Sequence, residues 1–342
     1  MGYDNLKLEK GMYRQEGMNF TQVLESLDPS ENYRGTALEG TDAFQRQLKR
    51  FGIRAKGAGS SPVEKFFRTM DSAVLFPEYI ARTVRQGMEE NDILPSLVAT
   101  TTVIDSMDYR SIYSVPTDED KELQAVEEGA AIPETEIKTK ENLVSLSKRG
   151  RMLVASYEAI RFQKLDLFGV MLRQIGAHIQ TMQVKDALTV LRSGDGNGNN
   201  AEEFLAGKDG VPINSDGTLN YGSLVNFWGK FDPYTMNTMV CSNAMMTQLL
   251  NIPELQNPLT GLNFQGTGKL GTPLGAQLHR TSALPDNVVV GLDNRYALEM
   301  VKAGDVLVEY DKLIDRQLER AAISTICGFA KLCDGACKVL NV

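Results

Sequence analysis

The hydrophobic side chains of residues 166–191 recur at three- and four-residue steps, which is the spacing of one face of an α-helix. About 26 residues at a rise of 1.5 Å per residue predict a helix about 39 Å long. Gly176 falls inside it at a cost of about 1 kcal/mol relative to alanine, which suggests close packing, and Gly194 is placed to end it in the left-handed conformation. Alone, such a stripe also fits an ordinary buried helix. It consists of Phe168, Leu172, Ile175, Ile179 and Met182, with Val190 and Leu191 near it further on.

Segments with a β-like pattern precede this helix. Residues 97–114 are rich in Val, Ile, Thr and Tyr, and residues 136–140 and 143–148 alternate roughly between apolar and polar positions, so each favours a strand. With the acidic residues between them they predict a two-stranded arm. Because a two-stranded hairpin is marginal alone in water, we expect this arm to gain its stability from another chain, which indicates oligomerisation.

Shorter patterns predict the remaining elements. Residues 20–27 and 42–51 favour amphipathic helices, residues 58–62 a linker or hinge, and residues 63–90 a helix broken or kinked around Pro77. A strand at 239–243 should end at a helix cap, Ser242 or Asn243, and lead into a helix at 244–250. Two short strands are expected at 287–292 and 305–310. The apolar tail from residue 321 predicts core strands, with helix as the alternative.

Bulk composition narrows the class of protein. The chain has 342 residues, 42% of them hydrophobic, without an apolar run near the ~18 residues that span a bilayer, and without an evident signal peptide. Its net charge is −8 and no strongly basic block occurs, which argues against a sequence-specific nucleic-acid binder. Four cysteines are too few for a disulfide framework and fit synthesis in a reducing cytoplasm.

Candidate metal and cofactor motifs all depart from the patterns that chemistry requires. Cys327, Cys333 and Cys337 match no common zinc spacing. The run from Asp195 to Asn199 imitates the start of an EF-hand loop, but positions six and twelve are Asn200 and Ala206. The glycines of residues 194–198 follow a helix, so they form no dinucleotide fingerprint, and residues 266–270 lack the full phosphate-loop pattern. We therefore expect no metal and no cofactor.

Catalytic motifs are equally weak. No nucleophile elbow of the G-x-S-x-G type occurs, and no spacing nominates a carboxylate pair for acid–base catalysis. The histidines are His178 and His279; His178 lies beside the helical stripe, where a core or interface position is the expectation. We do not expect an enzyme.

Five blocks in a fixed order carry a resemblance to a known family over residues 75–342. The first two are residues 128–134, with their acidic turn, and the long helix with its glycine-rich end at 194–198. The next are residues 240–243, then 274–277 leading to 288–291. The last is 306–309, followed by Arg316 and the apolar tail. In this order the chain resembles the major capsid proteins of tailed bacteriophages, which have the Hong Kong 97-type fold.

The resemblance implies an α+β fold with a long spine helix, an extended β-hairpin loop, a peripheral domain and an axial domain. It implies an N-terminal helical assembly segment with a linker, then an arm that runs along neighbouring subunits. The expected divisions are residues 1–62 for the segment and linker, 63–95 for the arm, 96–210 for the peripheral domain with its loop at about 115–150 and spine at about 165–192, 211–303 for the axial domain, and 304–342 for the return to the peripheral domain and the tail.

Function follows from the same resemblance. The implied protein is a structural subunit that self-assembles through pentamers and hexamers into an icosahedral shell around double-stranded DNA, in the virion, after assembly in the host cytoplasm. Implied partners are other copies of the chain, a portal protein, and a scaffold, maturation protease or decoration protein; DNA is packaged without sequence-specific binding, and no membrane is involved.

Residues of the loop and the arm are the expected sites of contact between subunits. Some relatives crosslink through a lysine near the loop proline, but this chain has Gly129 and Ile132 at the corresponding places, so we do not expect crosslinks. The loop residues are Glu127, Glu128, Ile132, Pro133, Glu134, Lys138 and Lys140, and the arm residues are Phe76, Pro77 and Tyr79.

Two other interpretations remain open from the sequence. An encapsulin-like shell has the same fold around a cargo enzyme, and the extended N-terminal segment favours the phage version. A monomeric α+β enzyme or binding protein is the second alternative. A stable particle below ~50 kDa in light scattering would support it.

Overall fold

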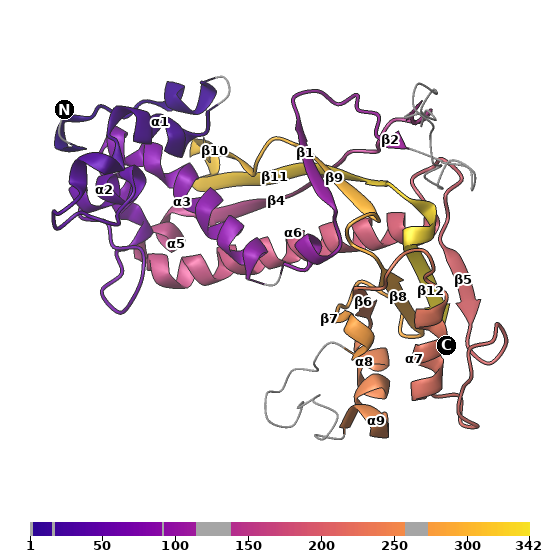
Figure 1. The fold of residues 1–342 in the computed structure, drawn as a ribbon. Coiled ribbons are helices and arrows are strands. Elements are labelled where there is room, and N and C mark those ends of the chain that lie inside the picture. Colours follow the sequence, from indigo (N-terminus) through magenta and orange to yellow (C-terminus); the bar gives the residue numbers. More distant parts are fainter. Residues whose placement is uncertain (1–2, 16–17, 91, 114–137, 257–272) are drawn as a thin grey trace, which may run out of the picture. The chain divides into compact units, whose positions relative to one another are not determined.

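The computed structural model describes residues 3–15, 18–90, 92–113, 138–256 and 273–342 (Figure 1). The chain divides into two compact units, and each is built from three separate stretches of sequence. The first consists of Met1–Asn91, Arg149–Gln180 and Asp305–Thr325; the second consists of Asp92–Lys148, Thr181–Gly304 and Ile326–Val342.

The N-terminal part of the first unit contains two short capped helices, α1 (Phe20–Leu27) and α2 (Ala43–Arg50). Asn19 and Asp42 each accept a bond from the amide three residues on, and a glutamine at that position returns a bond to the cap, so both helices begin with a capping box. These bounds agree with the predicted helices. Short 3-10 helices occupy Tyr3–Asn5, Lys10–Arg14, Ser30–Tyr33 and Val63–Phe67.

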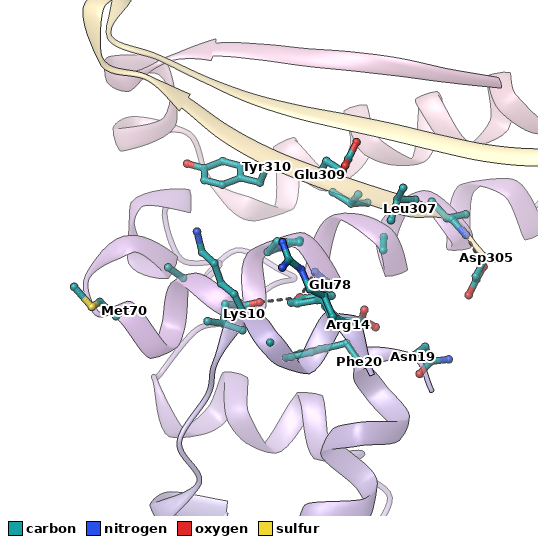
Figure 2. Close-up of a pocket in the computed structure, with 18 of the residues that line it drawn as sticks. Lys10, Arg14, Asn19, Phe20, Met70, Glu78, Asp305, Leu307, Glu309 and Tyr310 are labelled. Atoms are coloured by element: carbon teal, nitrogen blue, oxygen red, sulfur yellow. Dashed lines mark hydrogen bonds between the residues drawn. The ribbon is translucent and has the colours of Figure 1, made fainter. Parts of the chain in front are cut away.

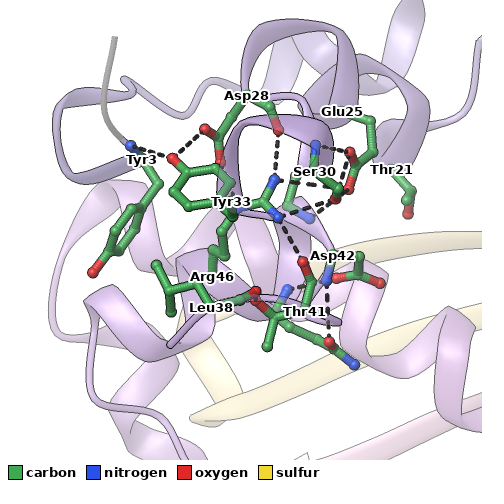
Figure 3. A network of polar contacts seen from close by, with 12 residues as sticks. Tyr3, Thr21, Glu25, Asp28, Ser30, Tyr33, Leu38, Thr41, Asp42 and Arg46 are labelled. Atoms are coloured by element: carbon green, nitrogen blue, oxygen red, sulfur yellow. Dashed lines mark hydrogen bonds and ion pairs between the residues drawn. The ribbon is translucent and has the colours of Figure 1, made fainter. Parts of the chain in front are cut away.

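A buried arginine holds these helices together (Figure 3). The Arg46 side chain is fully buried and donates from Nε to Asp28 Oδ2 at 2.7 Å. It also donates to the Asp28 and Thr41 backbone carbonyls and to the Ser30 hydroxyl, while the Tyr33 ring lies 4.3 Å from its guanidinium carbon. A buried charge is tolerated only when paired and fully hydrogen-bonded, and Arg46 meets both conditions.

Helix α3 (Met70–Glu89) follows a cap at Thr69 and continues through Pro77, so of the predicted break or kink at this proline the break is wrong. Proline cannot donate the helical bond and normally disturbs the preceding turn. The Tyr13 hydroxyl lies at this turn: it donates to the Val74 carbonyl at 2.7 Å and accepts from the Glu78 amide at 3.1 Å. It therefore bonds both members of the pair that would otherwise bond each other, which supports a continuous helix.

The N-terminal residues belong to the core of the first unit. Leu6, Phe20 and Phe44 pack in the same apolar cluster as Phe66 and Phe76. The described part of residues 3–53 is therefore packed into this unit through these side chains. Within the stretch expected as a linker, Ser61 is buried and its carbonyl accepts a bond from the Leu165 amide.

Helix α6 (Leu165–Ser193) confirms the predicted long helix and extends it slightly, to 29 residues, or about 44 Å. Leu172, Ile175 and Ile179 are buried, as predicted, and Phe168 is partly buried. The prediction that Met182 is buried is wrong, because 36% of this residue is exposed. Past this point the buried face consists of Gln183, Val184, Ala187, Leu188 and Leu191.

Glycines bring α3 and α6 into close contact within the first unit. A Cβ added at Gly176 would lie 2.0 Å from the Val84 carbonyl oxygen, and one at Gly87 would lie 2.1 Å from that of Arg173. No side chain fits at these distances, so the predicted close packing at Gly176 is confirmed. Gly194 ends α6 with φ +76°, as also predicted.

Strand β11 (Leu318–Lys331) contributes to both units. In the first, its residues 318–324 pair antiparallel with β10 (Leu307–Leu313), and it also pairs with β4 (Ser147–Ser156). The short helix α5 (Tyr157–Phe162) follows β4. In the second, its residues 327–331 pair with β9 (Leu298–Ala303), which is parallel to β1 (Thr100–Ile104).

A second sheet in the second unit has the order β5-β12-β8-β6-β7. Its bounds confirm the predicted strands near 239 and 287 and the strand interpretation of the tail, and α8 begins after a Ser242 cap as expected. No described helix is long and apolar enough to cross a membrane. The elements are β5 (Glu202–Leu205), β6 (Thr238–Cys241), β7 (Gln277–Arg280), β8 (Val288–Leu292) and β12 (Cys337–Asn341), with α7 (Tyr221–Gly229), α8 (Asn243–Leu250) and α9 (Pro253–Gln256).

Candidate assembly site at the base of the extended loop

Two short strands mark where the expected loop leaves the second unit and returns to it. Strand β2 (Ile112–Tyr113) pairs antiparallel with β3 (Lys138–Thr139), with Ile112 opposite Thr139 and Tyr113 opposite Lys138. The pairing joins the two ends of a 24-residue segment, 114–137, as the base of a hairpin requires. Residues 143–146, where we expected a strand, have no regular structure. The predicted contact residues Glu127, Glu128, Ile132, Pro133 and Glu134 lie outside the described residues.

The segment that enters the loop is fastened by a buried carboxylate. Glu299, on β9, is 4% exposed. It accepts from the Thr102 hydroxyl at 2.6 Å, from the Tyr109 hydroxyl at 2.8 Å and from the Ser111 hydroxyl. Burial and the bond to Glu299 raise the pKa of Tyr109, so it stays a donor. Three side chains along residues 102–111 thus converge on one acceptor and fix the path of this segment.

The segment that leaves the loop is fastened by a second buried carboxylate, Asp195. Its Oδ2 lies 2.7 Å from Lys140 Nζ and accepts from the Lys331 amide at 3.0 Å. Lys140 Nζ also donates to the Lys331 carbonyl. Asn197 donates to Asp195 Oδ1 at 2.8 Å, so both carboxylate oxygens are bonded.

Electrostatics explain why this cluster is stable although it is buried. Burial alone would raise the pKa of Asp195, but bonds from Lys140, Asn197 and the Lys331 amide outweigh it and hold the pKa below its usual value of 3.8. Lys331 is fully buried, and burial lowers its pKa. Its Nζ donates to the Asn199 carbonyl at 2.9 Å, which holds the glycine-rich loop from the other side.

The glycine-rich loop after α6 forms the socket for the returning segment. Gly194, Gly196 and Gly198 have φ of +76°, +90° and +73°, conformations that L-residues rarely adopt. The Asn142 side-chain amide donates to the Gly196 carbonyl at 2.8 Å, and the Asn142 backbone amide donates to Asn197 Oδ1 at 3.2 Å. The stretch that imitates a calcium loop in sequence therefore binds another part of the chain. No described group of three or more His, Cys, Asp or Glu side chains is placed to hold a metal.

The described members of the predicted contact set lie in different environments. Lys140 is 5% exposed and held by Asp195, so it anchors the loop to its own chain; its contact with another subunit stays a prediction. Lys138 is exposed. Phe76 and Tyr79, 3% and 6% exposed, lie in the core of the first unit, and only Pro77 of the arm set is partly exposed. The contacts of these arm residues with a neighbouring subunit stay predictions.

The sequence did not reveal Glu299 and Asn142 as part of this site. Their partners are about 190 and 55 residues away in the chain, so no local spacing connects them. A glutamate within the apolar run Leu298–Val301 is the one signal that could have been used.

Apolar side chains remain exposed close to the loop base in the second unit. Val103 is 72% exposed and Ile112 54%, although both lie in strands. Met107 and Leu143, on the connecting segments, are also exposed. Exposed apolar side chains gathered on a fixed base are a common sign of a protein–protein contact. Their exposure supports a contact surface.

Comparisons with known proteins find capsid proteins. Residues 139–316, slightly more than half of the chain, match the family model described as phage capsid protein. No curated protein matches. The capsid structure of the cyanophage P-SCSP1u has a TM-score of 0.52 at 12% identity, covering 73% of this chain and 88% of that one.

Two further structures have similar values. A Mycobacterium phage Che8 chain has a TM-score of 0.51 at 14% identity, covering 69% of this chain and 85% of the other. A virus-like particle from Pyrococcus furiosus has a TM-score of 0.50 at 14% identity, covering 77% and 98%. At these identities the likeness shows the fold alone.

Proposed function

Because the chain belongs to the phage capsid protein family, we propose that it assembles through its extended loop into pentamers and hexamers that close an icosahedral shell around double-stranded DNA. Its α+β fold, with the long helix α6 and the loop, is that of a tailed-phage major capsid protein. The finer parts of the proposal are the oligomers, the enclosed DNA, and the portal, scaffold, protease or decoration partners.

The observation that carries the proposal is the anchoring of the loop base. Buried carboxylates, Glu299 and Asp195, fasten both segments at the base. There the ribbon begins with two residue pairs, Ile112 with Thr139 and Tyr113 with Lys138. A two-stranded ribbon needs a further packing partner to be stable in water. A second copy of the chain is the partner that a closed symmetric assembly supplies at every position.

Negative charge is compatible with the proposed contents. A net charge of −8 without a basic cluster in the sequence gives a wall that does not hold a polyanion tightly. An encapsulin-like shell is the second candidate, supported by the fold likeness to the Pyrococcus furiosus particle, which is no stronger than the likeness to the phage capsids. The content of purified particles, DNA or protein cargo, separates the two.

Deletion of the loop tests the proposal. Since Lys140 anchors the base, the deletion should remove only residues 114–137 and join Tyr113 to Lys138 through an Asn-Gly turn, which suits a two-residue hairpin. We expect a subunit with the circular dichroism and thermal unfolding of the full chain that forms no shells in electron micrographs. Normal particles from this variant would reject the proposal.

A further inference from the structure

A small apolar crevice in the first unit is lined by both its sheet and its helices. The volume of the crevice is about 190 Å³. Its lining residues come from all three stretches of sequence that build this unit, and none comes from the second unit. Helices α3 and α6 contribute Phe76, Ile80 and Phe168, and the sheet contributes Tyr310, Glu319 and Ala321.

One face of the sheet directs side chains into the crevice. Tyr310 on β10 lies directly opposite Ala321 on β11, and Glu319 lies two residues before Ala321. Side chains that are directly opposite, or two positions apart along a strand, share a face of the sheet. These three side chains therefore lie together, and the small Ala321 leaves room beside the two larger ones.

Aromatic rings form another part of the wall. The Phe76 ring lies 5.6 Å from the Tyr310 ring in an edge-to-face contact and 6.2 Å from the Phe168 ring in a stacked one. Aromatic rings prefer edge-to-face or offset contacts with one another. The same preference favours an aromatic molecule as the occupant of the space beside them.

The size of the crevice suits a molecule slightly larger than benzene. An apolar cavity of about 150 Å³ stays dry and binds benzene, and this crevice is larger, at about 190 Å³. Ala159 on α5 and Met171 on α6 line the crevice and are exposed. The crevice therefore opens to solvent beside these helices, and a ligand can enter without unfolding of the unit.

A buried carboxylate gives the crevice one polar end. Glu319 is 6% exposed, and burial together with this neighbouring carboxylate raises the pKa of Tyr310, so the phenol stays protonated. The other charged lining residue, Arg320, is paired with Asp311 at 2.6 Å. A carboxylate has about four acceptor positions, so Glu319 can accept from a bound molecule in addition to its contacts within the chain.

Tyr310 also lines a larger groove of the same unit, where Figure 2 shows it with Lys10 and Arg14. The volume of this groove is about 980 Å³, and both of these basic side chains are exposed. A small apolar molecule would leave most of such a groove unfilled and would gain few contacts there. The crevice, with its apolar walls and matching size, is the better site for it.

We propose that the crevice binds a small aromatic molecule that carries one hydrogen-bond donor, with its ring against Phe76 and Phe168 and its donor directed at Glu319. The bound molecule adds contacts between the sheet and helices α3 and α6, so it stabilises the folded first unit by mass action. The inference goes beyond assembly, because all residues of the site belong to one copy of the chain.

Calorimetric titration of the purified chain with benzyl alcohol tests the inference. We expect saturable binding of one molecule per chain. Ala321→Leu fills the crevice and should weaken this binding at least about tenfold. Ala37→Leu is the control, because it makes the same change at an exposed position of the same unit outside the crevice, and it should bind as the original chain does. Equal binding by the two variants, or no saturable binding by the original chain, would overturn the inference.

A second filling variant keeps the test decisive if circular dichroism shows that Ala321→Leu does not fold. Ala155, on β4, lines the crevice and packs against the core of the first unit. Ala155→Leu should weaken the binding of benzyl alcohol to a similar degree. Unchanged binding by a folded Ala155→Leu chain would equally reject the site.

Ethylbenzene tests the role of Glu319, because it has the shape of benzyl alcohol without a hydrogen-bond donor. Glu319→Leu should weaken the binding of benzyl alcohol roughly tenfold, since a hydrogen bond to a charged acceptor is lost. It should change the binding of ethylbenzene by less than about twofold. A merely structural role of Glu319 would weaken the binding of both molecules alike, and that result would overturn the assignment of a donor-bearing ligand.

Discussion

At the scale of single residues, Asp195 connects segments that are distant in the sequence. The Lys140 ammonium, on the segment that leaves the loop, and the Lys331 backbone amide, at the end of β11, both donate to the same carboxylate oxygen. The Lys140 ammonium could not lie in this environment alone, because an unpaired buried charge is costly. The carboxylate therefore allows the chain to bring these segments together at the end of α6.

Asp195→Asn should lower the free energy of unfolding of the second unit by about 3 kcal/mol, because it leaves the Lys140 ammonium buried without a counter-charge. Urea unfolding followed by the fluorescence of Trp228, the single tryptophan and a residue of this unit, measures the loss. Asp216→Asn is the matched control: Asp216 is exposed and bonds to Thr218, so its loss should stay within about 0.5 kcal/mol. Equal losses in both variants would contradict the assigned role.

The pH dependence of this variant carries the same information. Because the folded-state pKa of Asp195 lies below its usual value of 3.8, the unfolded state binds the proton more readily near that pH. The stabilisation by Asp195 is fully present above pH 3.8 and is lost as pH falls through the lower folded-state pKa. The original chain should thus lose stability on acidification below pH 3.8 through this group, and Asp195→Asn should lack that component of the profile.

At the scale of elements, the contact between α3 and α6 depends on backbone approach. Gly87 and Gly176 each face a carbonyl of the opposite helix. Gly176→Ala would improve helix propensity by about 1 kcal/mol but place a methyl group 2.0 Å from the Val84 oxygen. We expect a net loss of about 1–3 kcal/mol from the forced separation of the helices.

The control for that substitution is Gly229→Ala at the end of α7, where an added Cβ meets nothing within 4 Å. Its thermal midpoint should be unchanged or slightly raised. A Gly176→Ala chain as stable as the Gly229→Ala chain would show that the helices separate without cost.

Tyr13 and Pro77 should be energetically coupled. Tyr13→Phe removes the hydroxyl that serves the Val74 carbonyl and the Glu78 amide, and should cost about 1–2 kcal/mol. With Pro77→Ala the helix regains a donor and can close its own bonds, so the second Tyr13→Phe should cost less. A double-mutant cycle in thermal or urea unfolding measures the difference. Additive effects would mean that the hydroxyl does not compensate for the proline.

The sequence predicted the elements whose pattern is local. Periodicity located α6 to within two residues of its observed ends, and Gly194 marked its stop, because helix period and the left-handed cap depend on neighbouring residues. The prediction of a buried Met182 failed because helix α6 changes its buried face along its length. Its later residues lie in a different unit from its earlier ones, and no local pattern shows where the change falls.

The burial of residues whose environment depends on distant partners did not follow from the sequence. Lysine is usually a surface residue. Lys140 is buried because its ammonium pairs with Asp195 and donates to the Lys331 carbonyl. Phe76 and Tyr79 were assigned to an arm that runs along neighbouring subunits. In the structure the Phe76 ring packs against Phe66, and the Tyr79 hydroxyl donates to the Leu165 carbonyl, 86 residues away in the chain. The roles of residues 127–134 stay predictions.

At the scale of the whole molecule, the N-terminal residues are part of a folded unit. Leu6, Leu8, Phe20, Leu24 and Phe44 are buried with the residues of α3. At about 2 kcal/mol for each buried side chain, they contribute roughly 10 kcal/mol of apolar burial as an upper bound. That amount is comparable to the whole stability of a domain. Removal of residues 1–50 should therefore destabilise the first unit.

A cut in the chain tests whether these residues are a removable segment. A protease recognition sequence inserted in the exposed loop at residues 56–59 allows cleavage after folding. We expect the fragments to co-elute on size exclusion and separate only in denaturant, because the buried surface persists when one peptide bond is lost. Their common unfolding should become dependent on protein concentration. Release of the N-terminal fragment, with the remainder folded and soluble, would instead show that it packs on the unit without stabilising it.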